Sequence, residues 1–343
     1  METATRRLPA EWEKQDGILL TWPTPQSDWA PYLDRIIPVF VELVRHISRF
    51  EQVVIAAPDP AEVVATLQRA ELSLQWVQCY PIETNDTWSR DFGPITVIEE
   101  GYPCLYDFGF NGWGLKFPAD FDNQITRQLD SAGAFSAPVT TQPLILEGGS
   151  LESDGCGTLL TTSTCLLSPN RNPHLKKHDI EQFFHDHMGI QQTLWLDHGY
   201  LAGDDTDSHI DTLARLCPNN TIVYVQCDDP EDEHYSALQQ MEEQLRHFKT
   251  LDDAPYRLLP LPWPQAVFDE EGDRLPATYA NYLVINNAVL APIYNDPADE
   301  QALAVLATAY PDHEIIAVDC SAVILQHGSL HCLTMQLPQG TLS

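Results

Sequence analysis

The order in which apolar patterns recur is the feature of this 343-residue chain that most constrains its fold. Five helical patterns begin near prolines, which fit the first turn of a helix because no backbone N–H is needed there: Pro31, Pro118, Pro173, Pro230 and Pro297. Three of these prolines follow a residue that commonly caps a helix: Asn172, Asp229 and Asp296. The last four starts lie roughly 60 residues apart, which indicates repeated structural units.

The predicted unit has two strands before the helix and one strand after it. In one example, apolar runs at 209–216 and 222–225 indicate a hairpin, and a run at 256–259 follows the helical pattern. About five β-β-α-β units of this size favour an α/β fold with radially arranged blades. A doubly wound parallel sheet is the alternative, because strands and helices alternate there too. No linker-like stretch divides the chain, so residues 1–343 are expected to form a single domain.

Four chemically versatile side chains lie at equivalent points of these units. Asp91, Glu147, His209 and Cys332 each occupy the loop or strand start that opens a predicted hairpin. Equivalent loops of a radial fold meet near its axis. Residues far apart in the sequence are therefore expected to share one pocket.

The residue types in this set suit the hydrolysis of a guanidinium group. The guanidinium carbon resists attack by water, so the reaction needs a better nucleophile, and a thiolate serves. It also needs an acid for the departing ammonia and then a base for water, and one histidine can act as both. Carboxylates can hold the N–H groups bidentately. Cys332 is therefore the candidate nucleophile and His209 the candidate acid/base, with Asp211 two residues further on and on the same face if this segment is a strand.

Other interpretations of these residues stay open. Cys332 could be a small buried apolar side chain, which is the commonest role of a cysteine. His209 could instead bind a divalent ion with the aspartates around it, although no second histidine stands at ligand spacing and no metal is predicted. Those aspartates are Asp204, Asp205, Asp207 and Asp211. Asp91 and Glu147 lie just before glycines and could be ordinary turn residues.

Composition narrows the classes of partner. With 50 acidic and 18 basic residues the formal net charge is −32, which repels nucleic acid and anionic lipid and attracts a small cation. The cysteines form no C-x-x-C pair, the N-terminus has no apolar signal-peptide core, and no apolar run has the length of a membrane span. We expect a cytoplasmic protein with free thiols and with no nucleic-acid or membrane partner.

Several motifs extend this pattern over nearly the whole chain. They are Trp22-Pro, Asn85-Asp-Thr-Trp-Ser-Arg-Asp-Phe-Gly-Pro94, Asp107-Phe-Gly-Phe-Asn-Gly-Trp-Gly114, Glu147-Gly-Gly149, Gly203-Asp-Asp-Thr-Asp-Ser-His-Ile-Asp-Thr212 and Leu330-His-Cys-Leu-Thr334. In this order they resemble the agmatine deiminase and bacterial peptidylarginine deiminase family, within the guanidine-modifying superfamily.

This resemblance implies a five-bladed, pseudo-symmetric α/β propeller of the pentein type, with the C-terminal strand closing onto the N-terminal blade. It also implies that Cys332 attacks the guanidinium carbon and that His209 protonates the departing ammonia and then activates water. Asp91 and Asp211 would grip the guanidinium nitrogens, and Glu147 would orient His209 or touch the substrate. Neither a metal nor an organic cofactor is implied.

The resemblance leaves the substrate to be chosen. Agmatine, which would give N-carbamoylputrescine and ammonia, is favoured over peptidylarginine because an acidic chain without arginines near the second motif suits a cation that lacks a carboxylate. Trp88, Trp113 and Trp29 are candidates for stacking on its aliphatic part. An amidinotransferase, a metal-dependent hydrolase and a non-catalytic binding propeller are the alternatives. A homodimer is the default oligomer, because closed dimers are the commonest assemblies.

Overall fold

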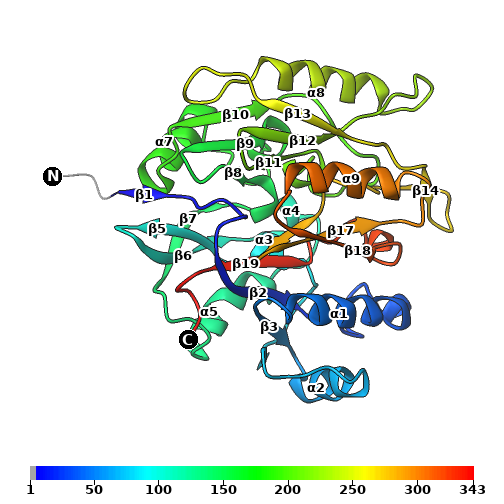
Figure 1. The fold of residues 1–343 in the computed structure, drawn as a ribbon. Helices are drawn as coiled ribbons and strands as arrows, with labels where there is room; N and C mark the ends of the chain where they lie inside the picture. The colour runs from blue at the N-terminus through cyan, green and yellow to red at the C-terminus, as the bar shows by residue number, and fades with distance from the viewer. Residues whose placement is uncertain (1–4) are drawn as a thin grey trace.

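The computed structural model describes residues 5–343 and has an α/β fold in which the strands form several small sheets (Figure 1). Within this range there are two four-stranded sheets, three three-stranded sheets and one two-stranded ribbon, formed by β14 (Val267–Phe268) and β15 (Arg274–Leu275). No sheet of the described residues closes on itself. The predicted α/β class is confirmed, whereas the five-bladed arrangement stays a prediction.

A β-β-α-β order underlies the larger sheets. In one of them β11 (Ala214–Cys217) pairs antiparallel with β12 (Thr221–Val225). The chain then passes through α8 (Tyr235–His247) and returns as β13 (Arg257–Leu261), which pairs parallel with β12. The return is parallel because the helix carries the chain back to the starting edge of the sheet.

The same order recurs in three further sheets, the first of which also carries β1 (Arg6–Arg7). Their elements are β5 (Ile95–Glu99), β6 (Tyr102–Gly109), α5 (Ile125–Ser131) and β7 (Val139–Ile145); β8 (Glu152–Ser153), β9 (Thr158–Thr162), α7 (Lys177–Met188) and β10 (Gln192–Leu196); and β16 (Leu283–Ile285), β17 (Ala288–Ile293), α9 (Asp299–Ala309) and β18 (Glu314–Asp319).

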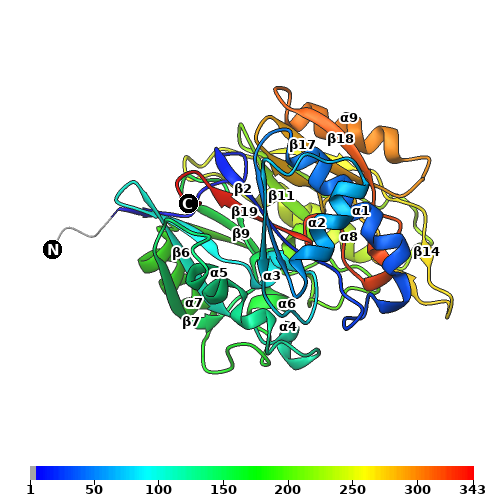
Figure 2. The ribbon, with the colours of Figure 1, turned by 90° about the horizontal axis from the view of Figure 1, so that it is seen from below.

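The remaining four-stranded sheet combines the two ends of the chain. β19 (Thr334–Pro338) pairs antiparallel with β2 (Gln15–Thr21), so a C-terminal strand lies beside an N-terminal one. β2 pairs parallel with β3 (Gln52–Ala57) after α1 (Leu33–Ile47), and β3 with β4 (Val77–Pro81) after α2 (Pro60–Arg69). Figures 1 and 2 show β2, β11 and β19 toward the middle of the molecule in both views.

The helices α7, α8 and α9 all begin later than their prolines predict. Asp296 accepts a hydrogen bond from the backbone N–H of Ala298 at 2.8 Å and closes a turn before α9. Asp229 closes a similar turn onto Glu231 at 3.0 Å before α8, and Asn172 bonds to strand β7 instead. The predicted helix caps at these three residues are therefore wrong. Short polar side chains that bond the backbone two residues further on compete with the start of a helix.

The strands are held by one cluster of buried apolar side chains. In β2 the side chains of Ile18, Leu19 and Leu20 are fully buried, as expected for a strand that is covered on both faces. None of the helices formed by residues 5–343 has the length and apolar character needed to cross a membrane. Turns at the ends of these buried strands carry the polar residues predicted to form the site.

Candidate active site

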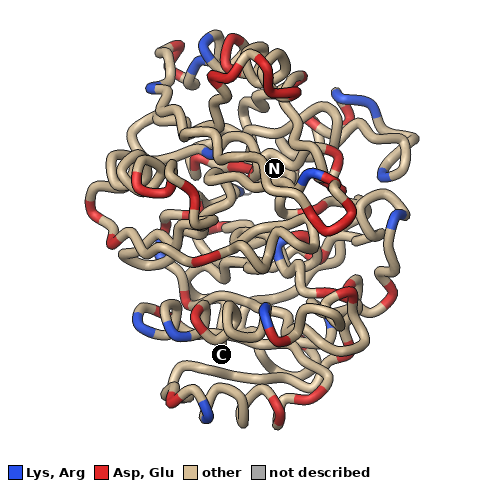
Figure 3. The backbone as a smooth tube through the Cα atoms, turned by 90° about the vertical axis from the view of Figure 1, so that its right-hand side faces the viewer, with Lys and Arg blue, Asp and Glu red and all other residues tan. Residues whose placement is uncertain are grey.

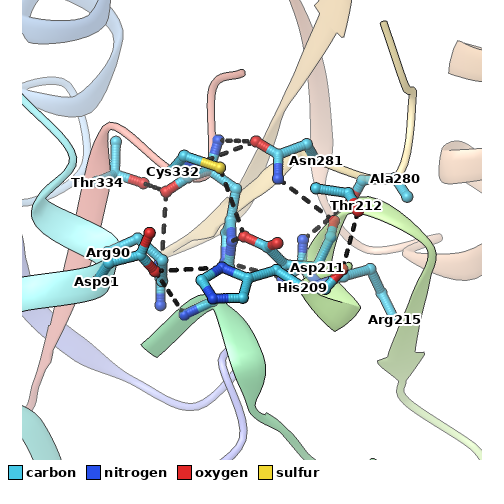
Figure 4. Close-up of polar contacts among 12 residues, drawn as sticks. Arg90, Asp91, His209, Asp211, Thr212, Arg215, Ala280, Asn281, Cys332 and Thr334 are labelled. Atoms are coloured by element: carbon cyan, nitrogen blue, oxygen red, sulfur yellow. Dashed lines mark hydrogen bonds and ion pairs between the residues drawn. The ribbon is translucent and has the colours of Figure 1, made fainter. Parts of the chain in front are cut away.

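The four predicted blocks meet in space. Figure 4 shows the thiol of Cys332 and the imidazole of His209 facing each other across a space flanked by the carboxylates of Asp91 and Asp211. The segments that carry the predicted residues are α3 (Ser89–Phe92), η3 (Gly148–Ser150), η4 (Ile210–Thr212) and the turn that precedes β19. Glu147 directly precedes η3, and His209 directly precedes η4.

Gly149 is required at the centre of this arrangement. A Cβ atom on this residue would lie 2.6 Å from His209 Nδ1, 2.8 Å from Asp91 Oδ1 and 3.2 Å from Asp211 Oδ2. These distances are shorter than van der Waals contacts, so any side chain would displace the three groups. They also place the imidazole and both carboxylates around one point. The Glu-Gly-Gly motif therefore contributes close approach of the backbone as well as a carboxylate.

Asp91 is buried and held by two donors. Its Oδ1 accepts the N–H of Gly149 at 3.0 Å, and its Oδ2 accepts the indole N–H of Trp113 at 2.8 Å. Burial raises the pKa of Asp91 to about 6, and the nearby charge of Asp211 acts in the same direction, while His209 opposes it. Asp91 is therefore a fixed carboxylate whose charge is costly without a cation.

His209 lies between two carboxylates and is fully buried. Its Nδ1 is 3.5 Å from Asp91 Oδ1, and its Nε2 is 3.5 Å from Glu147 Oε2. Burial by itself favours the neutral imidazole, but Asp91, Cys165 and Glu147 raise the pKa of His209 well above its ordinary value. The side chain is thus a proton donor at neutral pH, as an acid for a leaving amine must be.

Glu147 makes contacts that the sequence did not predict. It receives the Nε–H of Arg171, whose side chain is also fully buried, at 2.7 and 2.9 Å. Burial favours the protonated carboxyl, yet His209 and Arg171 lower the pKa of Glu147 below its usual range. Arg171 also binds Asp207 at 2.6 Å and so ties Glu147 to the loop that leads into His209. Arg171 stands outside every motif, so no local signal could have identified it.

Cys332 is buried at the bottom of the same space. Its Sγ lies 3.7 Å from Asp211 Oδ2, and its backbone N–H donates to Asn281 Oδ1 at 3.2 Å. Burial raises the pKa of the Cys332 thiol well above its ordinary value, and the charges of Asp211 and Asp91 add to this shift. The thiol is therefore protonated while no cation stands beside it.

Asp211 has one oxygen in use and one open. Oδ2 contacts the thiol and accepts the Nδ1–H of His331 at 2.8 Å. Within residues 5–343 the other oxygen, Oδ1, is buried without a hydrogen-bond partner. Burial favours protonation, but His331, and after it His209 and Arg215, lower the pKa of Asp211, so the group is a carboxylate. An unsatisfied buried acceptor costs about 1–3 kcal/mol and is expected where a ligand supplies the donor.

A cavity of about 200 Å³ leads to the thiol. Asp91 and Cys332 line its inner end, and none of the lining residues is Lys or Arg. The others are Asp28, Asp86, Trp88, Trp113, Phe117, Asp204, Asp205, Thr206, Thr212, Gln326, His327 and Gly328. Figure 3 shows acidic residues scattered over the visible chain and fewer basic ones among them. The five aspartates of the lining continue this acidic character into the cavity.

The three predicted tryptophans do not all line the cavity. Trp88 and Trp113 line the cavity. Trp29 does not line it: its ring lies 5.8 Å from that of Trp88, and its indole N–H donates to Thr87 Oγ1 at 2.8 Å. A Cβ atom on Gly328 would lie 2.2 Å from the ring of Trp88, so this glycine lets the indole pack closely against the Cys332 segment.

Asp204 and Asp207, two of the acidic residues that precede His209 in the sequence, bond to groups other than its imidazole. Asp204 accepts from the backbone and side chain of Thr206, and Asp207 pairs with Arg171 and with Lys116 at 2.8 Å. A different group, Glu147, Cys165 and His209, has ligand atoms within 4.8 Å of one another. Arg171 already neutralises Glu147 there, so a divalent cation would have to bind beside a fixed guanidinium charge.

A family comparison identifies the class of protein. The model of the Porphyromonas-type peptidyl-arginine deiminase family matches residues 7–338. The chain belongs to this family. Its match covers all the turns described above. The agmatine deiminase of Pseudomonas aeruginosa (strain LESB58) is 33% identical over 358 residues, covering 97% of this chain and 95% of that protein.

Solved structures of similar proteins also carry deiminase names. A protein of Porphyromonas gingivalis, provisionally described as an arginine deiminase, superposes with a TM-score of 0.94 at 46% identity, covering 99% of this chain and 100% of that one. The C. jejuni agmatine deiminase with substrate bound superposes with a TM-score of 0.91 at 39% identity, covering 99% of this chain and 98% of that one. The predicted resemblance is thus confirmed.

Proposed function

We propose that this chain is an agmatine deiminase, which converts agmatine and water to N-carbamoylputrescine and ammonia through a covalent adduct on Cys332. The observation that carries the proposal is an acidic cavity, free of Lys and Arg among its lining residues, that ends at a thiol opposite an imidazole. Agmatine is positively charged at both ends and has no carboxylate. The names of the P. aeruginosa and C. jejuni relatives add support.

In the first step the carboxylates would receive the substrate's guanidinium group. Asp91 contributes a charge that a cation stabilises, and Asp211 Oδ1 is an acceptor still open for an N–H donor. Trp88 and Trp113 would cover the alkyl chain, and Trp29 would act only by supporting Trp88. Tight bidentate contacts would hold the guanidinium carbon beside the sulfur.

Arrival of the cation would also activate the nucleophile. Burial and, after it, the charges of Asp211 and Asp91 keep the thiol protonated before substrate binds, and a bound guanidinium offsets the charges of the two carboxylates. The thiol then gives up its proton to solvent, and the thiolate forms a bond to the guanidinium carbon. His209, protonated beforehand, gives its proton to one nitrogen of the adduct, and the C–N bond breaks to release ammonia.

The second half of the reaction would return the enzyme to its starting state. Neutral His209 takes a proton from water, and the oxygen attacks the carbon of the S-alkylthiouronium adduct. The C–S bond breaks, the hydroxyl group gives up its proton to leave the neutral ureido product, and the departing thiolate takes up a proton to restore the thiol. Glu147 would keep the His209 ring in place throughout, since it contacts Nε2 while Nδ1 faces the two aspartates.

Peptidylarginine is the second candidate substrate, because the matching family model and the P. gingivalis relative carry arginine-related names. A substrate with a carboxylate needs a basic partner, and Lys116, the nearest basic residue in the sequence around Trp113, is already engaged by Asp205 and Asp207. This arrangement favours agmatine. An amidinotransferase would need a second amine to intercept the adduct.

A panel of substrates tests the proposal directly. Purified enzyme is given agmatine, free arginine or an arginyl peptide, without any added amine, and ammonia release is measured. Agmatine deiminase activity predicts fast release from agmatine and slow release from the other two. Faster release from the peptide would replace agmatine with peptidylarginine. No ammonia from any of the three, together with transfer of the amidino group to an amine once one is added, would indicate an amidinotransferase.

The same proposal covers the organisation of the protein. We propose a single domain over residues 1–343 with five β-β-α-β blades, in which β19 completes the N-terminal blade; the pairing of β19 with β2 supports this. We also propose that the protein is cytoplasmic and homodimeric, that it uses no organic cofactor, and that it binds neither nucleic acid nor membranes. The net charge of −32 supports a small cation as the ligand.

A further inference from the structure

We propose that His331 is a positioning residue of this active site, which holds the Asp211 carboxylate in the orientation that both the thiol and the substrate require. The inference rests on the proposed function, because it assigns a task within guanidinium hydrolysis. His331 immediately precedes Cys332 in the chain but does not line the cavity, so it acts through Asp211 and not on the substrate.

The contact with Asp211 defines this task. His331 is fully buried, and its Nδ1 lies 2.8 Å from Asp211 Oδ2. A carboxylate can only accept hydrogen bonds, so Nδ1 carries the proton. The same Oδ2 is the oxygen nearest to the Cys332 thiol, at 3.7 Å. Fixing Oδ2 in this way leaves Oδ1 as the open acceptor, so one hydrogen bond sets the direction of both oxygens.

The opposite edge of the imidazole faces charged groups of both signs. His331 Nε2 lies 3.0 Å from Arg215 Nη2 and 2.8 Å from Glu11 Oε1. Arginine can only donate and a carboxylate can only accept, so Nε2 faces one group of each kind, whereas Nδ1, which faces the Asp211 carboxylate, holds a proton in either case. Glu11 is in turn paired with Arg215 at 2.5 Å and with Arg90 at 3.1 Å. Arg215 also pairs with buried Glu152, which completes the charged groups around His331.

A neutral His331 is what the proposed chemistry needs. Burial, Arg215 and Arg90 lower the pKa of His331, although Glu11 and Asp211 oppose them. A neutral imidazole donates to Asp211 without cancelling its charge. An imidazolium would neutralise the carboxylate that is proposed to bind a cationic substrate.

The backbone links this positioning to the nucleophile. The N–H groups of His331 and Cys332 both donate to Asn281 Oδ1, at 2.9 and 3.2 Å. Asn281 in turn donates to the carbonyl oxygen of Asp211 at 3.4 Å. His331 and Cys332 lie in the turn that precedes β19, which the N–H of Thr334 closes by donating to the carbonyl oxygen of His331 at 3.0 Å. One short segment therefore directs the thiol into the cavity and the imidazole behind Asp211.

Two substitutions at His331 separate the proposed task from a merely structural one. In His331→Asn the side-chain amide nitrogen takes the place of Nδ1 and can still donate to Asp211, whereas in His331→Gln it takes the place of Nε2 and cannot. We expect kcat/KM for agmatine to fall roughly 10- to 100-fold further in His331→Gln than in His331→Asn, as for loss of one hydrogen bond to a charged group. The loss should include a raised KM, because Asp211 is proposed to bind substrate.

The rate of thiol alkylation by 2-chloroacetamidine gives a second measurement that does not depend on turnover. It should follow the same order, with His331→Asn faster than His331→Gln. Glu11→Gln is the matched control, because it disturbs the charges on the Nε2 side and leaves the bond to Asp211 intact. It should lower the melting temperature while keeping an alkylation rate above that of His331→Gln.

Equal losses in His331→Asn and His331→Gln, in proportion to their melting temperatures, would overturn the inference. So would equal alkylation rates in the two variants. If the wild-type enzyme released no ammonia from any guanidine compound, the proposed function would fail. The alkylation comparison would still decide the role of His331, because it reports only on the thiol and its neighbours.

Discussion

Replacement of Asp91 by Asn is the sharpest test of the carboxylate arrangement. The change keeps the shape of the side chain but removes its charge. Asp91 accepts from Gly149 N–H and from the Trp113 indole, so the amide group of Asn must turn its own N–H toward one of these two donors. Asp91 also contributes to the raised pKa of His209, which should therefore fall.

The size of the effect follows from burial. Asp91 is only 3% exposed, and removing one partner of a buried charge pair costs about 3–5 kcal/mol. If substrate and His209 together are its partners, that energy corresponds to a loss in kcat/KM of roughly a hundredfold to a few thousandfold. We expect a loss in this range with agmatine, measured by ammonia release across a series of substrate concentrations.

Asp107→Asn is a matched control for this experiment. Asp107 is a buried aspartate on β6 that pairs with Arg127 at 3.3 Å and does not line the cavity. It should keep wild-type kcat/KM even if its melting temperature falls. A folded Asp91→Asn protein with kcat/KM within roughly threefold of wild type would refute the reasoning, because the loss of a buried charge pair of typical strength costs far more free energy than such a change represents.

Three further outcomes are expected. Cys332→Ser should release no ammonia yet still bind agmatine in calorimetry, and measurable turnover would exclude the thiol as nucleophile. Burial raises the pKa of Asp91 to about 6, so the carboxylate loses its charge as the pH falls through that value. We therefore expect kcat/KM to drop about tenfold per pH unit below it. A kcat/KM that stays constant down to the ordinary pKa range of aspartate would contradict this. Added salt should lower kcat/KM for agmatine, because the net charge of −32 is expected to attract a cation over long range; no change would leave that charge with a role in solubility only.

The family and the composition of the site could be predicted from the sequence. Cys332, His209, Asp91, Glu147 and Asp211 lie in short motifs whose residue types indicate the chemistry. Strand and helix order could be predicted as well, because apolar periodicity is a local property. The predicted helix starts at Asp296 and Asp229 were wrong, because these side chains bond to nearby backbone instead of capping a helix.

The supporting residues could not be predicted. Arg171, Asn281 and Glu11 act through contacts with residues far away in the sequence, and nothing in their local surroundings distinguishes them. His331 stood inside a motif, yet its contact with Asp211 spans 120 positions of the chain. Trp29 was predicted to contact the substrate, but it packs against Trp88 and does not line the cavity.

The sequence by itself determined which chemical groups this protein has and in which repeating frame they stand, because residue type and periodicity are encoded locally. Only the tertiary structure decided which nitrogen of His209 faces the aspartates, which oxygen of Asp211 is left open, and that the Cys332 thiol is protonated at rest. These properties depend on burial and on charges brought together from distant segments. Electrostatic energies in a water-free interior are set by such neighbours and not by the residue alone.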